Sequence, residues 1–230
     1  PEQVEALVDA PVLAMVPLLG RRRRSTIERV DPEEFRGPFA EAFRTMRAHL
    51  DFRANAEGLT TAPRIMVTSA APSEGKSTTA AFLALAYAES ERRPVVIGGD
   101  LRRPTIHRLF GIERVPGLTT RALPGGNAVP LTSIVRQDPV SGVTLVPSGP
   151  SVDQVNDVMR DLIAVSEVAQ SSGQVVILDT APVRVANDAI DFLVAVDWVV
   201  LVVKAGKSTA RSVNQMMHTL RMNGAEVVGV

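Results

Sequence analysis

The sequence contains no cysteine, and aromatic residues make up only 4% of its 230 residues. Without cysteine the chain has no disulfide bonds and no thiolate metal sites, which agrees with a reducing compartment such as the cytosol. No apolar run approaches the roughly 18 residues that a membrane-spanning helix requires, and no secretory signal peptide is visible. These absences exclude a disulfide-stapled or membrane-spanning fold for this stretch of chain.

An excess of one charge is also missing. Twenty-five basic residues balance 25 acidic residues, so no overall field attracts nucleic acid, and we expect no nucleic-acid partner. Hydrophobic residues make up 45% of the chain, enough for one sizeable core. We expect an N-terminal, juxtamembrane-like arm over residues 1–36 and a single globular domain over residues 37–230.

The ends of the chain indicate a piece of a longer protein. It begins at Pro1 without a methionine and stops inside a predicted strand at 226–230. We therefore expect both flanks to be truncated. An arginine run at 21–24 then has two interpretations. It contacts anionic lipid, at about 1 kcal/mol per basic residue, or it is a solvated linker, which is the safer interpretation for a fragment.

Beyond the arm, apolar segments follow strand and helix patterns in turn. Several strands are separated by helices, which is typical of a mostly parallel, doubly wound sheet covered on both faces. The expected strands are 64–68, 94–98, 143–147, 174–178, 198–204 and 226–230, and the expected helices are 39–52, 77–91, 152–171 and 208–222.

The first predicted strand runs into a phosphate-binding loop, IMVTSAAPSEGKST over residues 65–78. Such a loop offers successive backbone N–H groups and the positive end of the next helix to a polyphosphate. Gly75 lets the backbone approach, Lys76 reaches the β- and γ-phosphate oxygens, and the Ser77 hydroxyl completes a Mg²⁺ coordination shell. The candidate contacts for ATP are Ser73, Glu74, Gly75, Lys76, Ser77 and Thr78.

The loop departs from the general pattern G-x-x-x-x-G-K-[ST], because Ala70 stands at the first glycine position. The order of strand, loop and helix still favours a phosphate site over a ligand-free turn. The predicted fold class is therefore α/β and P-loop NTPase-like.

Two further predicted strands end in an acidic residue. Asp100 follows the apolar run 95–97, and Asp179 follows the run 175–178. Ligands of open α/β sheets lie at the carboxyl ends of the strands, so both acids and the loop can converge on one Mg²⁺–triphosphate. The candidate metal ligands are Ser77, Asp100 and Asp179, and the candidate catalytic residues are Lys76, Asp100 and Asp179. Each acid taken alone could equally be a turn former or a helix cap.

Four segments in this order resemble the bacterial tyrosine kinases: Glu41-x-x-Arg44-x-x-Arg47 on the first helix, then SAAPSEGKST, GDLRRP and ILDTAP. The resemblance covers the chain from about residue 11 to its end. It implies a Mg-ATP-dependent protein-tyrosine autokinase on the cytoplasmic side of the plasma membrane. Such a domain is part of a polysaccharide co-polymerase, with the membrane-embedded export machinery of capsule or exopolysaccharide as partner.

The resemblance also gives a role to the first helix. Glu41, Arg44 and Arg47 share one broad helix face, and by resemblance they form the subunit contact of a ring-shaped homo-oligomer. The alternative is a solvated face whose Glu–Arg pair contributes about 0.2–0.5 kcal/mol.

Three features of the sequence depart from the family pattern. Gly98 stands where the family has the first acid of D-x-D-L-R-R-P, an acid that by resemblance binds metal and activates the tyrosine hydroxyl. Ala181 replaces the first proline of D-[ST]-P-P. The family's phosphoacceptors lie in a tyrosine-rich tail, whereas this chain has a single tyrosine, Tyr87, inside a predicted helix.

These departures leave three hypotheses open. The chain is an autokinase slowed by Gly98, or an ATP-binding assembly module of the same machinery that has lost catalysis. A partitioning-type ATPase is the third, but the signature lysine of that group has no counterpart at Ser69, Ala70 or Ala71.

Overall fold

The computed structural model describes residues 2–18, 29–123, 125, 129–152 and 156–230, so the arginine run 21–24 lies outside the described residues. Within this part, one sheet has the strand order β3-β4-β2-β5-β1-β6-β7. Every neighbouring pair is parallel except β3 with β4. The strands are β1 (Arg64–Ser69), β2 (Val95–Gly99), β3 (Arg136–Gln137), β4 (Thr144–Val146), β5 (Val176–Thr180), β6 (Trp198–Val202) and β7 (Val227–Gly229).

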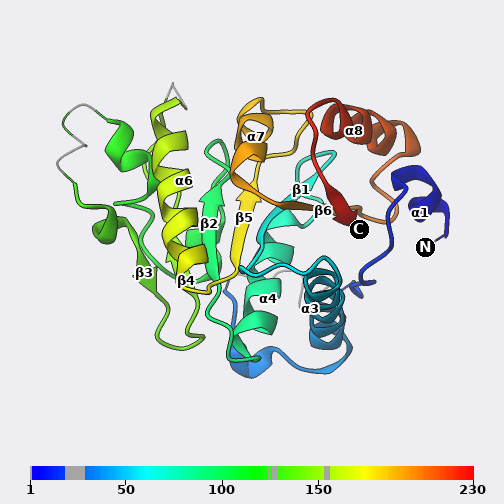
Figure 1. The fold of residues 1–230 in the computed structure, drawn as a ribbon, viewed down its shortest axis with the longest axis horizontal. Helices are drawn as coiled ribbons and strands as arrows, with labels where there is room; N and C mark the ends of the chain where they lie inside the picture. The colour runs from blue at the N-terminus through cyan, green and yellow to red at the C-terminus, as the bar shows by residue number, and fades with distance from the viewer. Residues whose placement is uncertain (1, 19–28, 124, 126–128, 153–155) are drawn as a thin grey trace.

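Helices cover both faces of this sheet (Figure 1), which confirms the predicted doubly wound α/β fold. The long helices α3 and α4 pack on one face, and α6 and α8 pack on the other. The helices are α1 (Glu2–Val8), α3 (Gly37–Ala56), α4 (Lys76–Ala88), α5 (Ile106–Leu109), α6 (Asn156–Ser171), α7 (Asp188–Asp191) and α8 (Ala210–Met222), with 3-10 turns at Pro32–Glu34, Leu118–Ala122, Leu131–Ile134 and Phe192–Ala195.

The helices on both faces explain why the strands are mostly apolar. Successive side chains of a strand point to opposite faces. In β1, Ile65 and Val67 therefore join the core under α3 and α4, whereas Met66 joins the core under α6 and α8. Because both faces are covered, most positions on either face are apolar, which gives the continuous apolar runs of the sequence. Thr68 in β1 and Asp179 and Thr180 in β5 are buried polar exceptions near the carboxyl ends of these strands.

An aromatic cluster joins α3 to α4, the helix that follows the phosphate-binding loop. Phe39 and Phe43 of α3 contact Phe82 of α4 with ring centroids 4.8 and 5.6 Å apart. Phe35, just before α3, lies 5.6 Å from Phe82. Such pairs contribute about 0.5–1.5 kcal/mol each beyond their buried area. The cluster therefore stabilises the packing of α4 against α3.

The residues that we predicted as an arm pack on the globular domain where they are described. Helix α1 lies against α8, with Val8 buried. Next to β7, Leu13 N–H donates to the Val230 carbonyl at 2.8 Å, and Val230 N–H donates to the Pro11 carbonyl at 3.0 Å. The N-terminal segment thereby covers the sheet edge at β7. Among the described residues, no helix combines the length and the apolar character needed to cross a membrane.

Strand β3 and the short helices were absent from our prediction. β3 has only two residues, and it forms by antiparallel pairing of Arg136 and Gln137 with β4. Two residues carry no detectable period, so the pairing partner decides such an element. Helix α3 extends beyond the predicted 39–52, from Gly37 to Ala56.

Candidate functional site

The loop between β1 and α4 has the geometry of a phosphate-binding loop. β1 ends at Ser69 and α4 begins at Lys76. Gly75 caps the helix in the left-handed region with φ +111°, where a residue with a Cβ is strained. Thr79 N–H donates to the Gly75 carbonyl at 2.8 Å, which starts the helical hydrogen-bond ladder. The first turn of α4 therefore presents main-chain N–H groups that have no partner within the helix.

The side chains at the start of α4 are buried or half-buried. Lys76 is only 6% exposed, so this residue has little contact with bulk water. Ser77 and Thr78 are half-buried in the same turn. At the helix N-terminus the macrodipole adds positive potential to that of Lys76, and both favour an anion.

Asp179 lies in the middle of the sheet beside this loop. It belongs to β5, where it pairs in register with Val67 of β1 on one side and Gly98 of β2 on the other. Its side chain is 1% exposed, and neither carboxylate oxygen has a hydrogen-bond partner among the described residues. Burial raises the pKa of Asp179 to about 7, although the Ser77 hydroxyl and the Lys76 ammonium act in the opposite direction.

Asp100 follows the end of β2 and also contributes to the raised pKa of Asp179, through charge repulsion. It is 6% exposed, and its Oδ1 accepts a hydrogen bond from Arg103 N–H at 2.9 Å. The acid therefore serves in part as a turn former, the alternative that the sequence left open. Its other carboxylate oxygen, Oδ2, is not used in this bond, and the carboxylate is close enough to Asp179 for the two charges to repel. Asp100 therefore remains a candidate metal ligand.

The residues present fit a Mg²⁺ ion bound together with a nucleotide. Mg²⁺ prefers oxygen donors and is usually held by one or two carboxylates plus substrate phosphates. Asp179 supplies a buried carboxylate with no protein partner, which is costly unless a cation compensates it. Ser77 and Asp100 supply further oxygens at the same edge of the sheet. In the described part of the chain, no group of three or more acidic or histidine side chains forms a separate metal site.

Gly98 occupies the position directly beside Asp179. Since the two residues are in register on neighbouring strands, a side chain at position 98 would lie on the same face of the sheet as Asp179. A Cβ there would come within 3.1 Å of the Ser148 main-chain nitrogen, a tight contact that requires a small shift. An acidic side chain at position 98 could therefore be accommodated after a small shift of the neighbouring main chain.

Tyr87 lies on the buried face of α4. It is 0% exposed, its hydroxyl has no hydrogen-bond partner, and burial raises its pKa far above the ordinary value. A phosphoryl donor cannot reach this hydroxyl in the folded chain. The interpretation of Tyr87 as a poor acceptor is therefore consistent with its position.

The charged face of α3 is paired within the chain. Arg44 makes a bidentate contact with Glu89 at the end of α4, at 2.7 and 2.8 Å, and a further bond to Glu41 at 2.5 Å. Arg47 donates to Asp51 at 2.9 Å. Within a single copy, these bonds agree with the solvated-face alternative. All three predicted interface residues lie on α3, and Arg44 contacts the end of α4 that is opposite the phosphate-binding loop.

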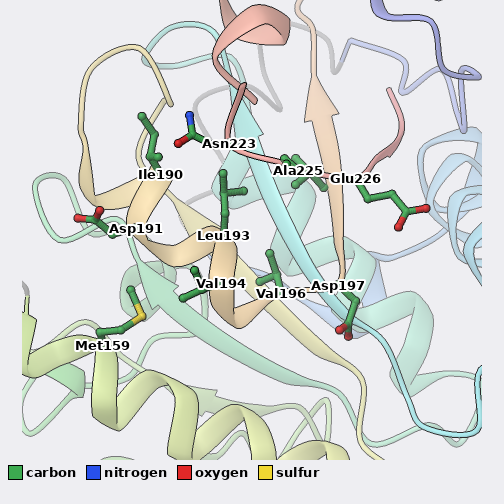
Figure 2. A pocket seen from close by; sticks show the side chains of 12 residues that line it. Met159, Ile190, Asp191, Leu193, Val194, Val196, Asp197, Asn223, Ala225 and Glu226 are labelled. Atoms are coloured by element: carbon green, nitrogen blue, oxygen red, sulfur yellow. The ribbon is translucent and has the colours of Figure 1, made fainter. Parts of the chain in front are cut away.

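The structure also contains a cavity of about 780 Å³ outside this site (Figure 2). Ile190, Leu193 and Val196 form apolar walls, and Asp197 and Glu226 lie before the starts of β6 and β7. The phosphate-binding loop follows the opposite, carboxyl ends of the strands. Both acids are already paired, Asp197 with Arg64 and Glu226 with Arg53. This cavity lacks the donors that a polyphosphate requires.

Sequence reasoning missed three residues that contact the phosphate-binding loop. They are Lys204, Lys207 and Ser208, in the segment after β6. Lys207 Nζ donates to the Pro72 carbonyl at 2.6 Å. A signal was present, since polar residues directly after a predicted strand at the site edge of the sheet are candidates by the same rule that selected Asp100 and Asp179.

Comparison with known proteins shows which proteins share these features. No family model matches the chain. Over 211 residues it is 28% identical to the tyrosine-protein kinase YwqD of Bacillus subtilis, covering 91% of this chain and 85% of the relative. It is 31% identical over 194 residues to the tyrosine-protein kinase Etk of Escherichia coli strain K12, covering 82% of this chain but 26% of Etk. Its fold matches the crystal structure of the chimeric protein CapA2B2 with a TM-score of 0.84 and 26% identity, over 100% of this chain and 96% of that one.

The fold and the loop define an α/β protein of the P-loop NTPase class. Within that class the chain is similar, by sequence and by fold, to the bacterial tyrosine kinases. The resemblance carried by the four sequence segments is thereby confirmed.

Proposed function

We propose that this chain is a Mg-ATP-dependent protein-tyrosine kinase domain that acts in the control of capsule or exopolysaccharide production. The observation that carries the proposal is the buried, unpartnered carboxylate of Asp179 beside the loop at Gly75–Lys76. An acid in that position is costly without a cation, and a loop in that position binds polyphosphate. The kinase names of the relatives support phosphoryl transfer as the reaction.

The chain's own residues then have distinct tasks. The N–H groups of the loop and the first turn of α4 hold the β- and γ-phosphates, and Lys76 neutralises charge that spreads over the transferred group. Ser77, Asp100 and Asp179 would hold Mg²⁺, which would supply charge neutralisation to the phosphates. Phosphoryl transfer obtains most of its acceleration from such positioning and electrostatics, so the site supports transfer even where a general base is weak.

A direct test is transfer of labelled γ-phosphate from ATP to a tyrosine-bearing peptide in the presence of Mg²⁺. We expect label on tyrosine in phosphoamino-acid analysis and none with the Lys76→Ala variant. Release of inorganic phosphate without phosphotyrosine would instead show that water is the acceptor and would support a partitioning-type ATPase.

Gly98 favours a second candidate, an assembly module that binds ATP without phosphoryl transfer. A positioned general base contributes typically about 10²- to 10⁴-fold, and the position that would carry it here has no side chain. Saturable ATP binding with neither phosphotyrosine nor released phosphate in the same assay would support this module.

The location and partners follow from the same proposal. The domain would lie on the cytoplasmic side of the plasma membrane, next to a membrane-embedded polysaccharide export machine and a tyrosine-rich tail as acceptor. Residues 1–36 would be the link to the membrane and residues 37–230 the kinase domain. The packed segment around Val8 and Leu13 gives this link a defined contact with the domain.

Self-association through α3 is a further prediction. We expect the chain to form oligomers at high concentration, and the combined Glu41→Ala, Arg44→Ala and Arg47→Ala variant to be a folded monomer, because charge complementarity selects the contact. Sedimentation velocity at several concentrations measures this.

Glu89→Ala is the matched control for that experiment. It removes one of the two intramolecular partners of Arg44 without changing the three residues of the motif, so it should leave the oligomer in place. The same oligomer in the parent and the triple variant, or a parent that stays monomeric throughout, would contradict the assignment of this face.

A further inference from the structure

The carboxylate of Glu74 is buried inside the phosphate-binding loop, where negative charge would repel a phosphate. The side chain is 4% exposed. Both of its oxygens are engaged by protein groups. Oε2 accepts from the Ala71 N–H at 2.7 Å, and Oε1 accepts from the Ser208 hydroxyl. Both carboxylate oxygens are therefore occupied by hydrogen bonds within the protein, and the main-chain N–H of Glu74 is the group that remains for a ligand.

The segment 204–208 after β6 binds the loop at three successive residues. Ser208 bonds to Glu74, Lys204 Nζ donates to the Ser73 carbonyl at 3.4 Å, and Lys207 Nζ donates to the Pro72 carbonyl. The segment is itself closed by a hydrogen bond from Lys204 N–H to the Ser208 hydroxyl oxygen at 2.8 Å. Two surface loops far apart in sequence thus form one hydrogen-bonded unit.

The phosphate-binding loop needs such support because part of its backbone is unfavourable. Ser73 has φ +61°, in the left-handed region that residues with a side chain rarely adopt. The contacts of Pro72, Ser73 and Glu74 with the segment 204–208 lie at this point. A loop held in that shape presents its N–H groups in one arrangement before a ligand arrives.

We propose that Glu74 and Ser208 are positioning residues, whose hydrogen bond preforms the loop for phosphate. This inference rests on the proposed nucleotide binding of the same site. Preorganisation raises affinity because ordering of the loop is completed before binding, so less free energy is lost when the nucleotide binds. Neither side chain touches the phosphates.

Calorimetry with MgADP on three single variants tests the proposal. We expect Ser208→Ala to weaken binding by about tenfold, since one hydrogen bond to a charged group is lost. Glu74→Ala should weaken it by at least as much, since the bond from Ala71 N–H is lost as well. Glu74→Gln should bind nearly as the parent does. Its amide oxygen can accept from Ala71 N–H while its amide nitrogen donates to the Ser208 hydroxyl, so both bonds survive without the charge.

The double variant Glu74→Ala/Ser208→Ala separates positioning from direct contact. If Ser208 acts only through its bond to Glu74, the double variant binds no more weakly than Glu74→Ala alone. If Glu74 touches the nucleotide itself, Ser208→Ala leaves affinity unchanged, which would overturn the proposal. Ser171→Ala, which removes an exposed hydroxyl of α6, is the matched control and should change nothing. Thermal melting of each variant checks that it is folded.

Hydrogen exchange of the nucleotide-free protein tests the link between Glu74 and Ser208 independently of the proposed nucleotide binding. Ser208→Ala should speed the exchange of the Ala71 amide, whose hydrogen bond depends on the orientation of Glu74, while the amides of β1 stay protected. If the parent bound no MgADP but this exchange difference appeared, the proposed function would fail and the structural link would stand. Unchanged exchange at Ala71 would reject the link.

Discussion

Lys76→Ala is expected to weaken MgADP binding by at least about tenfold, the loss of one charge-assisted interaction with phosphate. Lys76 is the first residue of α4 and is almost fully buried in the site. Its removal leaves the loop N–H groups in place but takes away the point charge proposed to face the β- and γ-phosphates. Calorimetric titration of the purified chain measures the change.

Arg211→Ala is the matched control for the lysine variant. Arg211 is an exposed cation near the start of α8, so its removal changes the net charge equally without changing the loop. Binding should then stay at the parental value. If Lys76→Ala bound MgADP as tightly as the parent, the assignment of the loop as the nucleotide site would be wrong.

Gly98→Asp should raise phosphotransfer to a tyrosine-bearing peptide by at least about tenfold, a cautious part of the usual general-base contribution. In register beside Asp179, the new carboxylate would lie on the same face of the sheet as this proposed metal ligand. The expected gain is in turnover and not in nucleotide affinity, because the loop and Lys76 are unchanged. Initial rates at saturating ATP, together with MgADP affinity, separate the two.

Gly98→Asn controls for the limited space at this position. Asparagine has the shape of aspartate without its acid, and it meets the same contact at the Ser148 nitrogen. If packing alone mattered, the two variants would behave alike. Since a second carboxylate beside Asp179 raises the cost of ionisation there, the gain should also require Mg²⁺. An unchanged rate in Gly98→Asp would reject Gly98 as the limiting position and favour the non-catalytic module.

The phosphate site could be predicted from the sequence because its parts are local. The loop at 65–78 needs only a strand before it, Gly75 at a left-handed turn and a helix after it, and these features lie within one short stretch. The convergence of Asp100 and Asp179 followed from a rule about parallel sheets, although their sequence positions are far apart. Their strands do in fact lie side by side.

Other properties of the site depend on neighbours that the sequence does not reveal. Burial raises the pKa of Asp179, and that burial depends on its place in the middle of the sheet, between β1 and β2. The pairing of Arg44 with Glu89 depends on how α3 crosses α4. The sequence pattern placed Arg44 on a helix face, but it could not identify a partner 45 residues away.

By itself the sequence determined the class of fold, the phosphate-binding loop and the likeness to the bacterial tyrosine kinases, since periodicity and short motifs are properties of neighbouring residues. The tertiary structure decided the strand order, the role of the N-terminal segment at the edge of β7, and the bond between Glu74 and Ser208. These features depend on contacts between segments that are distant in the chain, and their geometry is set by the packing of the whole sheet.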